Sequence, residues 1–300
     1  MNVVVIGAGA VGQLMASFLA EACFDVTLVV RRQEQADELN LKHITRVHID
    51  GTKTIHQIAS SVELEMLPRP DLIVVAVKYG HLQNIYKQLL GFPQEVPVLF
   101  VQNGLAHFDE ALRLSQNTIA FCSVSFGAQT IDLTTVQHRG VGLCKIGVAR
   151  GSSVVFEKLL HLKNPLFPIV LVENAEQMLF EKAVFNCMIN PITAVLQMKN
   201  GELVTNKHAY LLMHTIYQEL TEAFKGIEST IPFSAVIALC EKTAANTSSM
   251  LADRIQGRKS EVETIVGAVL QKAAANGYPL PTLRTLYHQV LALEESGGQS

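Results

Sequence analysis

Short apolar runs alternate with longer amphipathic segments through the first half of the chain. The runs are rich in β-branched residues, as expected of parallel strands covered on both faces, and they occupy residues 3–6, 25–30, 71–77 and 97–101. Segments with helical spacing of their apolar positions follow at residues 13–22, 81–90 and 107–114. This alternation predicts an α/β domain built on a parallel sheet.

The pattern changes twice in the rest of the chain. Glycines separate short β-rich runs that predict antiparallel strands extending the sheet, at residues 119–126, 130–137 and 141–148. Helical spacing then predicts helices over residues 177–198, 207–225, 233–256, 260–276 and 281–293, with a frayed tail at 297–300. We predict an α/β domain over residues 1–174 and an all-helical domain over residues 175–300.

Composition agrees with a folded body that binds small molecules. A length of 300 residues is typical of two domains. The alternative, one compact domain with an additional elaboration, is not excluded by length. Hydrophobic residues make up 49% of the chain and charged residues 17%, which is far from a disordered composition. The formal net charge is -3, without a block of Lys or Arg, so we expect neither nucleic acid nor a membrane as a partner.

Three further features of the sequence argue against a disulfide framework, a metal site and an N-terminal membrane or signal segment. Five scattered cysteines without a C-x-x-C pair argue against disulfides and a thiolate zinc site, and ten histidines lack metal-ligand spacing, so no metal is predicted. Residues 2–20 carry no charge, but glycines, Gln13 and Ser17 interrupt them and no basic residue precedes them. We therefore expect a strand, a turn and a helix there, in a cytoplasmic protein.

A glycine-rich loop follows the first predicted strand directly. Its spacing is G-x-G-x-x-G, formed by Gly7, Ala8, Gly9, Ala10, Val11 and Gly12. Gly7 permits a tight turn, Gly9 lets the backbone approach a pyrophosphate, and Gly12 lets the following helix pack closely on the strand. The free N–H groups at the helix start attract phosphates. We therefore predict a dinucleotide-binding domain with a doubly wound Rossmann-type sheet.

The end of the second predicted strand indicates which dinucleotide is bound. Arg31 and Arg32 stand where NAD-specific proteins place an acid for the ribose hydroxyls. A guanidinium can bind a 2′-phosphate bidentately, so NADP is preferred over NAD. Alternatively, either arginine simply ends a strand at the surface, and the contribution of Arg32 stays open.

Two further polar residues follow predicted strands of the same sheet. Lys78 follows the run at 71–77, and Asn103 follows the run at 97–101. Ligands in open α/β sheets bind beyond the carboxyl ends of the strands, so we expect both residues near the glycine loop. Each also has an ordinary interpretation, as an exposed strand-end lysine and as part of an Asn-Gly turn.

Polar residues recur at helical spacing in the second half. Lys182, Asn186 and Asn190 stand at i, i+4 and i+8, which places an ammonium and two carboxamides on one face of an otherwise apolar helix. Pro191 follows and favours a bend. The spacing alone equally allows a solvated stripe on an amphipathic helix.

Together these residues carry a family resemblance. The glycine loop, Arg31, Lys78, residues 102–104, the Lys182 stripe with residues 201–203, residues 248–250 and Glu261 resemble the ketopantoate (2-dehydropantoate) reductase family over nearly the whole chain. The resemblance implies that Lys182 is the general acid, that Asn186, Asn190, Ser249 and Glu261 bind the substrate, and that Lys78 and Asn103 serve the cofactor and the hydride-transfer region. Phe180 stands where relatives often carry tryptophan, so the shape of the pocket can differ.

The chemistry agrees with these residue types. Hydride addition to a ketone leaves charge on its oxygen, which a cationic donor such as Lys182 can stabilise and protonate. The hypothesis is NADPH-dependent reduction of 2-dehydropantoate to (R)-pantoate, for pantothenate and coenzyme A biosynthesis, in a cleft between the domains. The alternatives are reduction of another small 2-oxo acid and a non-catalytic NADPH-binding sensor. Ser249 and Glu261, taken singly, are equally typical of helix surfaces, and a homodimer stays open.

Overall fold

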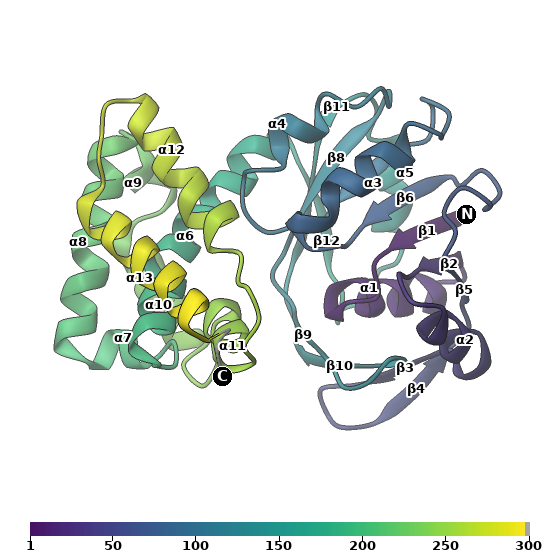
Figure 1. Ribbon diagram of the computed structural model, residues 1–300, viewed down its shortest axis with the longest axis horizontal. Helices are drawn as coiled ribbons and strands as arrows, with labels where there is room; N and C mark the ends of the chain where they lie inside the picture. The colour runs from purple at the N-terminus through teal and green to yellow at the C-terminus, as the bar shows by residue number, and fades with distance from the viewer. Residues whose placement is uncertain (298–300) are drawn as a thin grey trace. The chain divides into compact units, whose positions relative to one another are not determined.

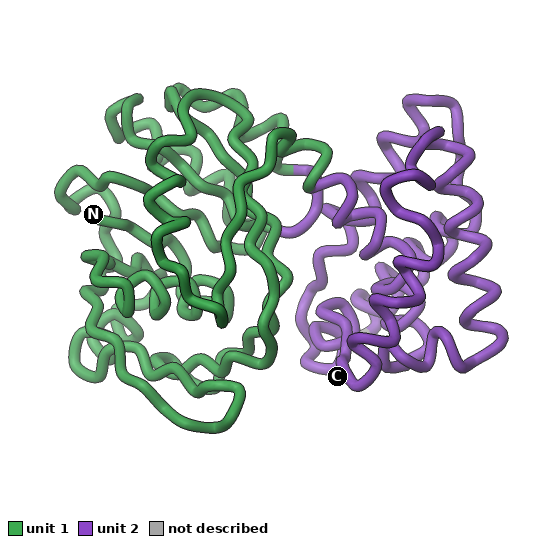
Figure 2. The backbone as a smooth tube through the Cα atoms, turned by 180° about the vertical axis from the view of Figure 1, so that it is seen from behind, with its two compact units in different colours: residues 1–102, 107–178 green, residues 103–106, 179–300 purple. Residues whose placement is uncertain are grey.

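The computed structural model describes residues 1–297 and divides the chain into two compact units. Unit 1 comprises Met1–Gln102 and His107–Met178, and unit 2 comprises Asn103–Ala106 and Leu179–Ser300 (Figure 2). The chain thus enters unit 2 twice, first for four residues and then for its second half. A domain boundary at residue 174 stays a prediction. Residues 298–300 of the expected tail lie outside the described residues.

Unit 1 is built on an eight-stranded sheet, and its elements follow the predicted alternation. The strands of this sheet are β1 (Asn2–Ile6), β2 (Asp25–Val29), β5 (Ala59–Ser61), β6 (Leu72–Val75), β7 (Val98–Phe100), β8 (Ile119–Val124), β11 (Cys144–Arg150) and β12 (Ile169–Val172). The helices are α1 (Ala10–Glu21), α2 (Gln33–Lys42), η1 (Tyr79–His81), α3 (Leu82–Leu89), α4 (Phe108–Ala111) and α5 (Val154–Leu160) (Figure 1).

The strand order of this sheet is β12-β11-β8-β7-β6-β1-β2-β5. β5, β2, β1, β6, β7 and β8 are mutually parallel neighbours. Their order is that of the doubly wound dinucleotide-binding fold, with the reversal of strand order beside β1. The predicted fold class, an α/β unit with a Rossmann-like sheet and a helical second half, is confirmed.

The strands after residue 119 differ from our expectation in two ways. β8 pairs parallel with β7, whereas β11 pairs antiparallel with β8, and β12 runs parallel to β11. The middle run does not extend this sheet: β9 (Gly127–Thr130) and β10 (Thr135–Gly140) join β3 (Ile44–Val47) and β4 (Lys53–His56) in a second, four-stranded sheet. The expectation was wrong because β10 pairs with β3, a partner far away in the sequence, and local alternation carries no information about such pairing.

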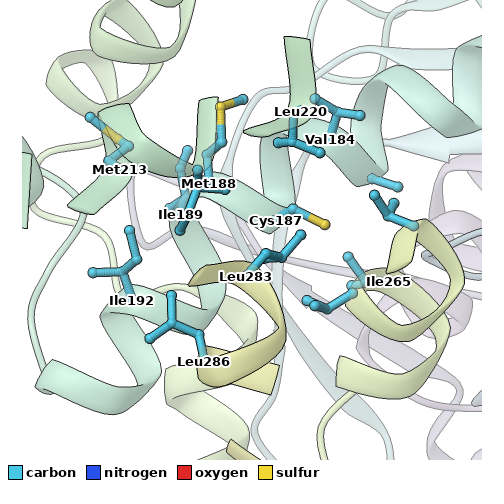
Figure 3. Close-up of a cluster of buried hydrophobic side chains, with 14 of the residues drawn as sticks. Val184, Cys187, Met188, Ile189, Ile192, Met213, Leu220, Ile265, Leu283 and Leu286 are labelled. Atoms are coloured by element: carbon cyan, nitrogen blue, oxygen red, sulfur yellow. The ribbon is translucent and has the colours of Figure 1, made fainter. Parts of the chain in front are cut away.

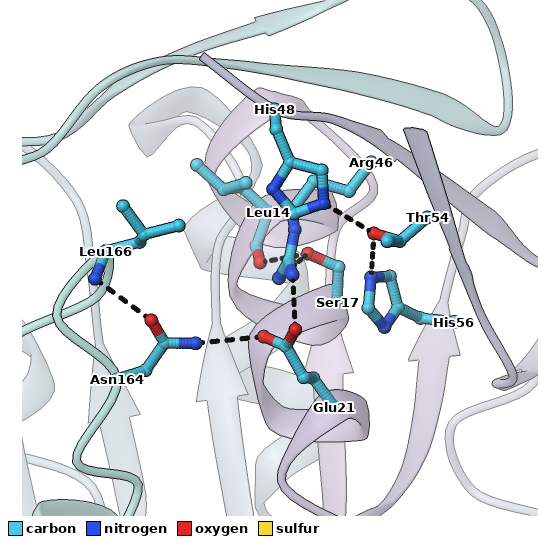
Figure 4. A network of polar contacts seen from close by, with 9 residues as sticks. All are labelled: Leu14, Ser17, Glu21, Arg46, His48, Thr54, His56, Asn164 and Leu166. Carbon is cyan, nitrogen blue, oxygen red and sulfur yellow. Dashed lines mark hydrogen bonds and ion pairs between the residues drawn. The ribbon is translucent and has the colours of Figure 1, made fainter. Parts of the chain in front are cut away.

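A buried cation fastens this second sheet to α1. Arg46 on β3 is fully buried, and its guanidinium lies 4.0 Å from the ring centroid of Phe18. It donates to the carboxylate Oε1 of Glu21 at 2.8 Å (Figure 4). Phe18 and Glu21 both belong to α1, so this helix is held between the two sheets. Burial and the charge of Arg46 lower the pKa of the neighbouring His56 to about 4.

Unit 2 is helical in its described part. It contains most of α6 (Ala175–Leu196), then α7 (Glu202–Thr205), α8 (Lys207–Ala223), α9 (Ile227–Thr230), α10 (Phe233–Lys242), α11 (Ser249–Ile255), the π-helical turn η2 (Glu263–Gly267), α12 (Ala268–Ala275) and α13 (Pro281–Gly297). The single helix predicted over residues 233–256 is two helices, because Ser248 caps a new one at its N-terminus by accepting from the N–H of Leu251 at 3.1 Å.

Helix α6 supplies the centre of this unit. Its apolar face contributes Val184, Cys187 and Ile192 to a cluster that α8, η2 and α13 complete (Figure 3). Within residues 1–297, α6 is also the one helix long and apolar enough to cross a membrane. That is weak support for a membrane span, because the core helix of a soluble protein meets the same criterion and 67% of its apolar window is buried here.

A buried histidine gives unit 1 a testable dependence on pH. His107 is fully buried between Phe100 and Phe121, and neither ring nitrogen has a partner among the described residues. Burial lowers the pKa of His107 from 6.5 to about 4. As the pH falls, the imidazole of His107 therefore binds a proton in the unfolded chain before it does so in the folded protein. The free energy of unfolding decreases as the pH falls from 6.5 towards 4, by on the order of 3 kcal/mol.

We expect His107→Phe to remove much of this loss. The melting temperature of the variant should fall less steeply than that of the wild type between pH 6.5 and pH 4 in thermal unfolding scans. The same substitution at the exposed His161 is the control and should leave the slope unchanged. Parallel slopes for wild type and His107→Phe would contradict the assignment.

Candidate functional site

The glycine-rich loop connects β1 to α1 through two positions that exclude any side chain. Gly7 has a φ of +108°, and its N–H donates to the carbonyl of Val29 at 2.8 Å. A Cβ at Gly12 would lie 1.9 Å from the carbonyl oxygen of Gly7. The loop can therefore keep this path only with glycine at both positions.

The third glycine leaves space in front of the helix. Gly9 is exposed, and nothing lies within 4 Å of the place where its Cβ would be. It is the N-cap of α1, where no side chain accepts from the first N–H groups and no acidic residue occupies the first turn. These N–H groups and the positive end of the helix dipole fit a phosphate. The remaining predicted loop residues, Ala8, Ala10 and Val11, are half-buried.

Three other residues follow neighbouring strands at the same edge of the sheet. Arg31 lies just beyond β2 and is exposed, and Lys78 lies just beyond β6, where it precedes η1 and is also exposed. Gln102 follows β7; its Nε2 donates to the carbonyls of Val75 and Val77 at 2.9 Å each. Since β2, β1, β6 and β7 are parallel neighbours, their carboxyl ends share one edge. Open α/β sheets bind dinucleotides beyond the carboxyl ends of such strands.

In unit 2 the predicted polar stripe lies on one continuous helix. α6 extends through Pro191, so Lys182, Asn186 and Asn190 lie on the same face. Lys182 and Asn186 are half-buried and Asn190 is only 5% exposed. A solvated stripe would be exposed at all three positions, so these residues do not form one. Their role in a site stays a prediction.

Asn103 is the residue that joins the predicted site residues of unit 2. Its Oδ1 accepts from Nζ of Lys182 at 2.6 Å, and its Nδ2 donates to Oε2 of Glu261 at 2.9 Å. The main chain of Asn103 continues directly from Gln102 of unit 1. A position of Asn103 near the glycine loop and a role toward the cofactor stay predictions.

The chemistry of the two neighbours fixes the orientation of this carboxamide. An ammonium can only donate and an ionised carboxylate can only accept, so the amide oxygen must face Lys182 and the amide nitrogen must face Glu261. The flipped amide would place donors against donors. Asn103 is therefore hydrogen-bonded to Lys182 through its amide oxygen and to Glu261 through its amide nitrogen.

The two neighbouring serines have different environments. Ser249 is exposed as the first residue of α11. Ser248 is 6% exposed, and its Oγ lies 2.7 Å from Oγ1 of Thr193. Thr193 in turn donates to the carbonyl of Asn190 at 2.9 Å. Ser248 and Thr193 thus connect the start of α11 to α6, a link that sequence reasoning missed because a buried Thr-Ser pair has no characteristic spacing.

Within residues 1–297 no group of three or more His, Cys, Asp or Glu side chains could hold a metal ion. The cysteines form no disulfide among the described residues; Cys187 is fully buried on α6, and burial raises the pKa of its thiol.

The glycine loop offers a matched pair of substitutions. Gly12→Ala should lower the free energy of unfolding by about 1–3 kcal/mol, since its methyl group has no space beside Gly7. Gly9→Ala has open space, so it should leave the melting temperature unchanged and weaken dinucleotide binding. Thermal unfolding and fluorescence titration would measure both; equal melting temperatures for the two variants would contradict the packing argument.

The chain matches known proteins over almost its full length. The model of the family described as ketopantoate reductase PanE/ApbA matches residues 3–151, and the model of its C-terminal part matches residues 174–294. The 2-dehydropantoate 2-reductase of Listeria innocua is 37% identical over 296 residues, which are 98% of this chain and 97% of that protein. The Bacillus subtilis protein of the same name is 33% identical over 298 residues, 99% of this chain and 98% of its own.

Solved structures agree with these matches. The crystal structure of the probable 2-dehydropantoate 2-reductase of Bacillus subtilis superposes with a TM-score of 0.88 at 32% identity, covering 98% of this chain and 100% of that one. A ternary structure of D-mandelate dehydrogenase with NADH and anilino(oxo)acetate also reaches a TM-score of 0.88, at 21% identity and full coverage of both chains, which is a likeness of fold alone. On the strength of the matched family models and the full-length relatives, this chain belongs to the ketopantoate reductase family.

Proposed function

We propose that this chain reduces 2-dehydropantoate to (R)-pantoate with NADPH, in the cytoplasm, for pantothenate and coenzyme A biosynthesis. The observation that carries the proposal is the hydrogen-bonded line of Lys182, Asn103 and Glu261 in a member of the ketopantoate reductase family. A non-catalytic sensor would need the dinucleotide site alone, without an oriented ammonium. The homodimer that the sequence left open stays a hypothesis.

Lys182 is the proton donor in this proposal. When bound, the reduced nicotinamide supplies a hydride to the 2-oxo carbon of the substrate. Negative charge then develops on the former carbonyl oxygen, and an ammonium in hydrogen-bonding reach stabilises that charge and transfers its proton to the oxygen. The bond to Oδ1 of Asn103, at 2.6 Å, keeps the Lys182 side chain in one arrangement before substrate arrives.

The carboxamides of α6 and the hydroxyl at the start of α11 are the substrate-binding groups in this proposal. Asn186 and Asn190 can each donate to a carboxylate and accept from a hydroxyl, and Ser249 can do either. None of the three adds a charge that would compete with Lys182 for the developing oxyanion. Glu261 acts through Asn103, which it holds at 2.9 Å, and can accept from a substrate hydroxyl as well.

The phosphates and the nicotinamide end are assigned to unit 1. The uncapped start of α1 and the open space at Gly9 fit the pyrophosphate. The exposed guanidinium of Arg31 fits the 2′-phosphate that distinguishes NADPH from NADH. Lys78 supplies a second cation at the same edge of the sheet.

The proposal is tested by following NADPH oxidation at 340 nm with purified protein and ketopantoate. We expect turnover with ketopantoate and much slower turnover with other small 2-oxo acids, such as pyruvate. Lys182→Ala should lower kcat by about 10²–10⁴-fold and leave the dissociation constant of NADPH unchanged. Lys207→Ala, at an exposed lysine of α8, is the control and should behave as the wild type.

Three results would contradict the proposal. Absence of turnover with every oxo acid, despite tight NADPH binding, would favour the sensor. Faster turnover with another oxo acid would keep the reductase and change its substrate. An unaltered kcat in Lys182→Ala would remove the lysine from its role.

Arg31 gives an independent prediction about the cofactor. Arg31→Ala should weaken NADPH binding by about 10–100-fold, the loss expected for a bidentate charge-assisted contact, and should leave NADH binding nearly unchanged. Arg32→Ala, at the exposed residue just before α2, tests in the same way whether the second arginine contributes. Dissociation constants for both dinucleotides can be measured by cofactor fluorescence; equal losses for NADPH and NADH would refute the 2′-phosphate assignment.

A further inference from the structure

The segment that carries Asn103 into unit 2 approaches Thr264 through two successive residues. The N–H of Leu105 donates to the main-chain carbonyl of Thr264 at 3.0 Å. Gly104, between Asn103 and Leu105, has a φ of +86°, and a Cβ there would lie 2.2 Å from the same carbonyl oxygen. Two separate constraints therefore require glycine at position 104: its backbone conformation and its contact with Thr264.

Thr264 also contacts Glu261, the residue to which the side chain of Asn103 donates. Its side-chain Oγ1 donates to the main-chain carbonyl of Glu261 at 3.0 Å. The same carbonyl accepts from the N–H of Ile265 at 3.0 Å. Thr264 is 4% exposed and lies in η2, the π-helical turn, and Ile265 beside it points into the apolar core of unit 2 (Figure 3). The residue is therefore fixed by its surroundings.

We propose that Thr264 is a positioning residue for the proton donor, an inference that rests on the proposed function of Lys182. Through its carbonyl it sets the main chain that follows Asn103, and through its hydroxyl it sets the main chain of Glu261. The carboxamide of Asn103 lies between these two main-chain contacts. Its Nδ2 donates to Glu261, and its Oδ1 accepts from Nζ of Lys182. Thr264 acts only through Asn103 and Glu261.

The geometry of this arrangement is demanding enough for small shifts to matter. The bonds of Asn103 to Lys182 and Glu261 measure 2.6 Å and 2.9 Å, and each loses most of its strength when the distance exceeds about 3.5 Å. A misplacement of about 1 Å at a catalytic group can cost on the order of 100-fold in rate. Displacing the Gly104 peptide from Thr264 would move Asn103 by such an amount.

The decisive comparison is Gly104→Ala against Gly226→Ala. Both glycines belong to unit 2 and have nearly the same backbone conformation, with φ values of +86° and +91°. Nothing lies within 4 Å of a Cβ at Gly226, whereas one at Gly104 meets Thr264. Gly226→Ala therefore reproduces the backbone strain of the other variant without displacing the contact.

We expect Gly104→Ala to lower kcat for ketopantoate reduction by about 100-fold, while the dissociation constant of NADPH stays within about twofold of the wild type. The ratio of rates in H2O and D2O should rise, because a displaced ammonium slows proton delivery in particular. Gly226→Ala should keep the wild-type kcat and isotope effect. Equal kcat values for the two variants would overturn the proposal.

A second pair tests Thr264 itself, and it decides the matter if Gly104→Ala fails to fold. Thr264→Val keeps the shape and the main-chain carbonyl but removes the hydroxyl donor to Glu261; kcat should fall about fivefold, as for the loss of one ordinary hydrogen bond. Thr264→Ser restores the donor and should restore kcat. Equal rates for the Val and Ser variants would show that the hydroxyl does not position the site.

The test separates this inference from the proposed function. If the wild type reduces ketopantoate and neither pair of variants differs, only the positioning role of Thr264 is wrong. If the wild type does not reduce ketopantoate, crystal structures decide: Gly104→Ala should lengthen the contact between Lys182 and Asn103 beyond about 3.5 Å, and Gly226→Ala should preserve it at 2.6 Å. An unchanged distance in Gly104→Ala would again refute the role.

Discussion

The ammonium of Lys182 rests against the carboxamide oxygen of Asn103, and the arrangement of unit 2 around α6 maintains that contact. A lysine side chain has four rotatable bonds, so a half-buried ammonium without an acceptor would adopt many positions. Asn103 selects one of them because its own amide is oriented by Glu261. The apolar face of α6 then fixes the backbone from which the lysine extends, so packing and polar chemistry act on opposite faces of one helix.

The two units illustrate two ways in which neutral dipoles help to prepare a charged site. In unit 1 the loop glycines and the uncapped start of α1 present main-chain N–H groups, so attraction for an anion comes from the backbone itself. In unit 2 the neutral carboxamide of Asn103 accepts from Lys182 and donates to Glu261, so its dipole orients the cation. Both devices rely on dipoles whose direction is set by the fold.

Much of this architecture follows from local patterns in the sequence, and the remainder depends on pairing across the chain. Parallel strands such as β1 and β6 were predictable because residues buried on both faces form uninterrupted apolar runs. The glycine loop and the stripe on α6 were predictable because a turn and a helix face have fixed spacings. The second sheet was not predictable, because β10 pairs with β3, which lies far away in the sequence. For the same reason the bond between Asn103 and Lys182, 79 residues apart, could be found only in three dimensions.

The four residues Asn103–Ala106 have a consequence for how this protein can be rearranged during evolution. They lie in the sequence of unit 1, but their contacts belong to unit 2, so the second unit is assembled from two separated pieces of chain. A gene split after residue 174 would encode one fragment that carries Asn103 without its lysine and another that carries Lys182 without its acceptor. Each half thus contributes one member of the pair. Recombination that exchanged only the helical half would preserve the contact only where the retained half has the Asn-Gly step and the new half supplies the lysine and the Thr264 carbonyl in matching places.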